Sequence, residues 1–73
     1  MDHVEIVQRF NRRFPVGHPV TVRSDDGTLH EGHVCASARL SSCAAPIVWV
    51  SGFAGSCRLD RIVEAHLVES EPG

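Results

Sequence analysis

The sequence contains no lysine and no tyrosine, and it contains only three cysteines. All seven basic residues are therefore arginines, which we interpret as the codon bias of a GC-rich genome. Three cysteines cannot all pair within one chain, and we expect no secretory signal behind the acidic start at Met1 and Asp2. The longest nearly continuous apolar run, residues 44–50, is far shorter than the roughly 20 residues that span a bilayer. We therefore predict a cytoplasmic protein without a membrane segment.

The composition is that of an ordinary globular domain. Hydrophobic residues make up 42% and charged residues 22% of the 73 residues, which leaves room for a single domain. A chain this short buries only about 60% of the surface that its unfolded form exposes, so its core is small. Pairing with a second copy would bury further apolar area and cover a sheet edge, and we therefore predict a homodimer. The net charge of −2 argues against a dedicated duplex-DNA binder.

Residues 2–14 carry the signature of one short amphipathic helix. Asp2 can cap the free amides, and Glu5 stands three residues later. The apolar residues that recur at helical spacing are Val4, Val7, Phe10 and Phe14. Pro15 and Gly17 are expected to end the helix. Three arginines lie on the helix surface outside the apolar stripe: Arg9, Arg12 and Arg13. They form either a solvated polar face or a site for an acidic partner.

Residues 18–68 are typical of a small barrel of short β-strands, followed by a polar tail at residues 69–73. The expected strands are residues 20–23, 28–35, 47–50, 56–59 and 63–68. Leu29 and Val34 would face opposite ways in a regular strand, so we predict a bulge at Gly32 that bends the second strand and closes the sheet. Residues 36–46 show no period and are expected to form a long loop, and residues 60–62 one helical turn.

This layout resembles a small five-stranded SH3-like barrel preceded by one short N-terminal α-helix, a mainly β fold. More specifically, residues 14–20 (FPVGHPV) and 46–50 (PIVWV), with glycines at positions 52 and 55, resemble a group of short uncharacterised proteins encoded by phages and prophages. The resemblance covers about fifty residues. It implies a mobile-element origin, and hence the cytoplasm of a bacterial host, but no assigned activity.

A second, distant resemblance concerns the plasmid-borne type II dihydrofolate reductase, which is also a small SH3-like barrel. It rests on Gly17 before a strand and on Gly55 and Ser56 before a short strand that leads to residues 61–62. The reductase site depends on a Gln-Ile-Tyr run, but the aligned residues here are Arg58, Leu59 and Asp60. This departure predicts no reductase activity.

No other enzymatic motif is present. The chain lacks a nucleophile elbow and a phosphate-cradling loop, so we predict a non-enzymatic protein without a cofactor. The residue types that could bind zinc are His30, His33, Cys35 and Cys43. Their spacing contains neither a Cys-x-x-Cys nor a His-x-x-x-His pair, so we interpret them as surface histidines and small thiols and expect no metal site. Cys57, which alternates with Leu59, is expected to be a core residue.

The two aromatic candidates for a contact surface are Trp49 and Phe53. We expect Trp49 to be at least partly buried on its strand, and Phe53 to be exposed on a glycine-flanked turn. The favoured function is the binding of a protein, with inhibition or modulation of a host factor such as a defence complex as the outcome. The residues predicted to make contact are Phe53, Trp49, Arg39, Leu40, Arg9, Arg12 and Arg13.

The alternative function is binding of single-stranded nucleic acid, because small barrels stack bases on aromatic side chains beside a positive groove. The residues that would form this site are Arg39, Arg58, Trp49 and Phe53. Nine acidic residues and few aromatic residues argue against this alternative.

Overall fold

The computed structural model describes the backbone of residues 2–69 and begins with the expected helix. Helix α1 (His3–Arg13) starts at Asp2, whose Oδ1 accepts a 2.8 Å hydrogen bond from the N–H of Glu5. Its apolar stripe is confirmed, because Val7 and Phe10 are both buried. The helix ends where predicted, before Pro15.

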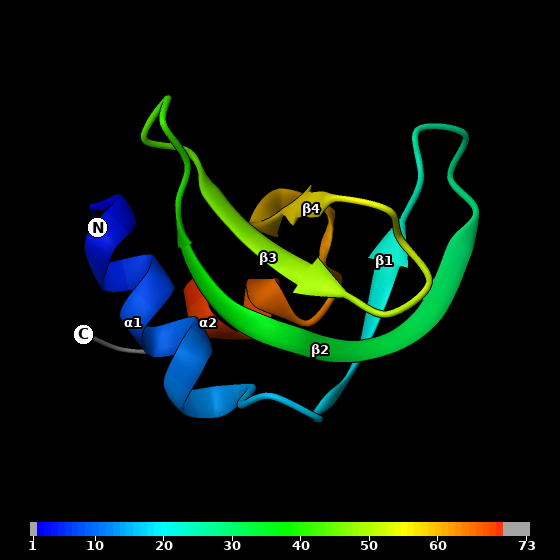
Figure 1. Cartoon of the computed structure of the whole chain (residues 1–73), viewed down its shortest axis with the longest axis horizontal. Coiled ribbons are helices and arrows are strands. Elements are labelled where there is room, and N and C mark those ends of the chain that lie inside the picture. Colours follow the sequence, from blue (N-terminus) through cyan, green and yellow to red (C-terminus); the bar gives the residue numbers. More distant parts are fainter. Residues whose placement is uncertain (1, 70–73) are drawn as a thin grey trace.

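The strands form one antiparallel sheet of four strands in the order β1-β2-β3-β4 (Figure 1). Their bounds are Pro19–Arg23 for β1, Leu29–Leu40 for β2, Pro46–Val50 for β3 and Ser56–Arg58 for β4. A 3₁₀ turn, η1 (Leu59–Arg61), follows β4 at the position expected for a helical turn, and helix α2 (Ala65–Glu69) comes last. A mainly β fold with an N-terminal helix is thus confirmed, as an open sheet.

The fifth strand expected at residues 63–68 is wrong, because most of this segment lies in α2. In this described part of the chain, only the backbone of residues 62 and 63 pairs with the backbone of β1. Ile62 forms a single antiparallel bridge with Val22, and the N–H of Val63 donates to the carbonyl of Thr21 at 2.9 Å. The carboxylate of Glu64 then accepts the N–H of Thr21 at 2.7 Å. These two hydrogen bonds occupy both backbone groups of Thr21, so the edge of β1 is covered without a further strand. The expected tail at residues 69–73 lies outside the described residues apart from Glu69, which ends α2.

Strand β2 joins the two halves of the sheet, running from its hairpin with β1 to the side where α1 lies (Figure 1). The predicted bulge at Gly32 is wrong, because the pairing of β1 with β2 is regular through this residue. Leu29 is 60% exposed while Val34 is fully buried, as expected for opposite faces of a regular strand. The register shifts occur later, on either side of Ala36. Residues 36–40 therefore belong to β2, and the expected loop at 36–46 shrinks to residues 41–45.

Gly32 has a different role from the one expected. A Cβ atom at this position would lie 2.8 Å from Cγ1 of Val50 and 2.9 Å from the carbonyl oxygen of Ser51. Only glycine therefore lets β2 pass so close to the end of β3.

The irregular end of β2 is held by α1. The side-chain amide of Asn11 donates to the carbonyl of Ala38 at 2.9 Å, and its Oδ1 accepts the N–H of Ala38 at 2.7 Å. Asn11 thus takes the place of a neighbouring strand beside the second register shift. The core lies between α1, the inner face of the sheet, η1 and the start of α2, and its buried residues are Val7, Phe10, Phe14, Val20, Val22, Val34, Ala38, Val48, Val50, Leu59, Ile62 and Ala65. Within residues 2–69, neither helix has the length and apolarity needed to cross a membrane.

Candidate functional site

The outer face of the sheet carries an apolar strip between two arginines. On β3, Val48 and Val50 point into the core, so the alternating residues Ile47 and Trp49 point outward and are only partly buried. Ile47 pairs with Arg39 on β2 and with Arg58 on β4. We call this surface, formed by Arg39, Ile47, Trp49 and Arg58, the Trp49 face.

The charges of the Trp49 face are arranged around its aromatic ring. The guanidinium carbon of Arg39 lies 4.9 Å from the ring centroid of Trp49, which is a cation–π contact. Arg58, on the other side of the strip, pairs with Asp60 at 3.2 Å, and both side chains are largely exposed. The face therefore combines a flat apolar centre with guanidinium groups from two flanking strands.

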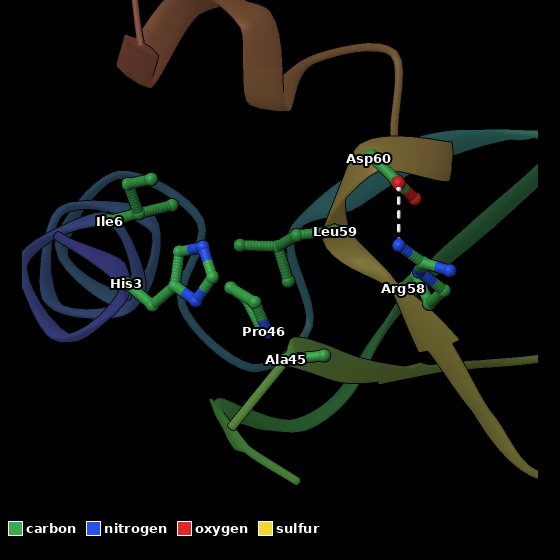
Figure 2. Close-up of a pocket in the computed structure, with 7 residues that line it drawn as sticks. All are labelled: His3, Ile6, Ala45, Pro46, Arg58, Leu59 and Asp60. Carbon is green, nitrogen blue, oxygen red and sulfur yellow. Dashed lines mark ion pairs between the residues drawn. The ribbon is translucent and has the colours of Figure 1, made fainter. Parts of the chain in front are cut away.

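Beside this face lies a small notch of about 170 Å³ (Figure 2). It is open between α1, the turn before β3 and the start of η1. One wall is formed by His3, whose Nδ1–H donates to the carbonyl of Ala44 at 2.9 Å. We call it the His3 notch, and its lining residues are His3, Ile6, Ala45, Pro46, Arg58, Leu59 and Asp60.

Phe53 does not join the Trp49 face. It is half-buried and packs against the core, with its ring 6.0 Å from that of His30 in an edge-to-face arrangement. The expectation that Phe53 is exposed is therefore wrong. The turn between β3 and β4 folds Phe53 toward the gap between β1 and β4, where Val22 and Cys57 also line the surface groove. Phe53 thus covers the side of the sheet that no fifth strand closes.

The remaining predicted contact residues are scattered. Leu40 is partly buried against the core. The three helix arginines lie on α1, whose apolar residues pack on the inner side of the sheet, away from the Trp49 face. Arg9 is mostly buried and pairs with Glu5 at 2.9 Å, whereas Arg12 and Arg13 are exposed. Of the residues predicted for either function, the structure therefore brings together Arg39, Trp49 and Arg58.

Among residues 2–67, whose side chains the structure describes, no three His, Cys, Asp or Glu side chains gather where they could hold a metal ion. Cys35 and Cys43 are exposed, and Cys57 packs partly against the core as expected. Burial raises the pKa of the Cys57 thiol, which disfavours the reactive thiolate.

Comparison with known proteins gave no match: no family model, no curated protein and no solved structure is significantly similar to this chain. The geometry of the site is therefore the basis on which a function can be inferred. Sequence reasoning missed two contributors to the site, Ile47 and the His3 notch. Alternation along β3 could have placed Ile47 beside Trp49, but nothing local in the sequence indicates that α1 and η1 meet around the notch.

Proposed function

We propose that this chain is a non-enzymatic module of phage or mobile-element origin that binds a protein through the Trp49 face. The observation that carries the proposal is the cation–π contact of Arg39 with the partly exposed Trp49, in the same face as Ile47 and Arg58. Tryptophan and arginine dominate the residues that carry binding energy in protein interfaces. The contact also restrains both side chains before a partner arrives, which lowers the entropy cost of binding.

We further propose that the fold is related to an SH3-like barrel in which the fifth strand has been reduced to the Val22–Ile62 bridge. The bridge follows a 3₁₀ turn and reaches β1, as a closing strand would. The partner would be a host factor, such as a component of a defence complex, whose activity the chain inhibits or redirects.

The homodimer also stays a proposal. Strand β4 has only three residues and no second neighbour strand among the described residues, so its backbone groups are free to pair with another copy. Light scattering at tens of micromolar tests this, with twice the monomer mass expected and the monomer mass as the contrary result.

The experiment that tests protein binding is a nuclease-treated pull-down from lysate of the native host. Wild type is compared with Trp49→Ala and Arg39→Gln. Arg23→Gln on β1 serves as the matched control because it also removes an exposed arginine, but one outside the Trp49 face. We expect a stoichiometric protein that is lost with the first two variants and retained with the control. Retention by all variants, with correct folding verified by circular dichroism, would contradict the proposal.

Single-stranded nucleic acid is the second candidate, favoured by the position of Arg39 and Arg58 on either side of Trp49. Arg39 already covers one face of the Trp49 ring, so a base could stack only on the other face or displace it. Ionic strength separates the two functions. Binding to phosphates weakens steeply between roughly 50 and 200 mM salt, whereas binding to an apolar protein surface changes little.

A further inference from the structure

The His3 notch has the size of a single side chain. Its volume of about 170 Å³ lies below the roughly 300–1,000 Å³ of pockets that hold small-molecule ligands or cofactors. Its apolar walls come from three separate elements and are formed by Ile6, Pro46 and Leu59 (Figure 2). An apolar side chain entering the notch would therefore contact carbon atoms on several sides.

The two ends of the notch offer complementary hydrogen-bonding groups. At one end, the Ala44 carbonyl can only accept, so Nδ1 of His3 is the donor, and in the singly protonated tautomer that this bond selects Nε2 is an acceptor. At the other end, Arg58 uses one Nη atom for Asp60 at 3.2 Å. A guanidinium has five N–H donors, so others remain for a second anion, while the ion pair with Asp60 orients the group.

We propose that the His3 notch binds the C-terminal residue of a partner protein, where that residue is apolar. The side chain would pack between Ile6 and Leu59, the terminal carboxylate would accept from Arg58, and the backbone N–H would donate to Nε2 of His3. A chain terminus fits this arrangement because it carries an apolar side chain, a carboxylate and an N–H on one residue. An internal aspartate or glutamate has no apolar side chain beside its carboxylate.

The inference rests on the proposed protein-binding function, and it adds that the partner must present a free C-terminus whose last residue is apolar. Arg58 belongs to both surfaces, lining the notch and pairing with Ile47 in the Trp49 face. A partner whose last residue lies in the notch would therefore reach the Trp49 face with the preceding part of its chain. Capture of a C-terminal carboxylate is a known mode of peptide recognition.

The test is an NMR titration of the full ¹⁵N-labelled chain with the peptide acetyl-Gly-Ser-Gly-Leu as the free acid. We expect saturable shifts of the amides of His3, Ile6 and Leu59. The same peptide with a C-terminal amide should bind at least about tenfold more weakly, because a hydrogen bond between charged groups is lost. Equal affinity of the acid and the amide, shifts centred elsewhere, or no saturable shifts at millimolar peptide would each overturn the proposal.

Two variants locate the site. Arg58→Gln should reduce the affinity for the acid to that for the amide, whereas Arg23→Gln, an exposed arginine that does not line the notch, should leave it unchanged. An equal loss with both variants would show only general charge attraction and would overturn the proposal.

The variant His3→Ala separates this inference from the function on which it rests. If His3→Ala and the free-acid peptide leave partner capture unchanged while Trp49→Ala abolishes it, the notch proposal fails and the protein-binding function stands. If Trp49→Ala abolishes capture, and His3→Ala or the free-acid peptide also reduces it, both the notch proposal and the protein-binding function stand.

Discussion

Replacing Asn11 by alanine should strongly destabilise the fold, because one side chain holds both backbone groups of Ala38. The two hydrogen bonds, at 2.9 and 2.7 Å, are partly buried and lie beside a register shift in β2. Leaving a buried backbone group unpaired costs about 1–3 kcal/mol, and water reaches a partly buried site, so about 2–4 kcal/mol is expected for the pair. A chain of this length has a total stability of only about 4–11 kcal/mol.

Urea unfolding followed by the fluorescence of Trp49 measures this loss, with exposed Gln8→Ala on the same helix as the control. The urea concentration at the midpoint of unfolding should fall, while the slope of the unfolding free energy against urea concentration should change little. The melting temperature should fall by about 10 °C or more. Asn11→Asp keeps the acceptor for the Ala38 N–H but turns an oxygen toward the Ala38 carbonyl, so it should be at least as damaging. A loss below about 1 kcal/mol for Asn11→Ala, or one equal to that of Gln8→Ala, would mean that the two hydrogen bonds to Ala38 do not hold the end of β2.

Three further predictions concern the packing. Gly32→Ala should cost about 1–3 kcal/mol in thermal unfolding, because the added Cβ meets the backbone of Ser51, and unchanged stability would contradict the close approach. Phe53→Ala should cost about 2–3 kcal/mol in urea unfolding, less than a fully buried phenylalanine, while a change below 0.5 kcal/mol would mean that the ring is solvated. In labelling with a disulfide reagent at pH 8, Cys57 should react more slowly than the two exposed cysteines, since its thiol pKa is raised by burial; equal rates in the folded protein would contradict this.

Local signals predicted the elements that local interactions determine. The cap at Asp2 and the 3.6-residue spacing of Val7 and Phe10 identified α1, and the turn glycines separated the strands of the sheet. The segment after residue 62 was misassigned, because its valines favour a strand whereas Glu64 instead turns back to the N–H of Thr21. That contact spans 43 residues, and no local pattern encodes it.

The site was predictable only in part for the same reason. Trp49 and Arg39 were identified from residue type, but their contact depends on register shifts in β2 that move Arg39 along β3. The glycines around Phe53 suggested an exposed turn, whereas the open side of the sheet left an apolar surface that its ring covers. Because the register shifts were not foreseen, residues 36–40 of β2 were assigned to a loop. Because the open side of the sheet was not foreseen, Phe53, a packing residue, was assigned to the interface.

Site-specific photocrosslinking in native host cells shows whether the Trp49 face contacts a protein. A benzoylphenylalanine at Ser56, which pairs with Trp49 on β4, is compared with one at Leu29, which is exposed on the β1–β2 hairpin. We expect one discrete protein adduct from position 56 that disappears when Trp49→Ala is added. Adducts from position 29 alone, equal adducts from both positions, or adducts only to nucleic acid would contradict it.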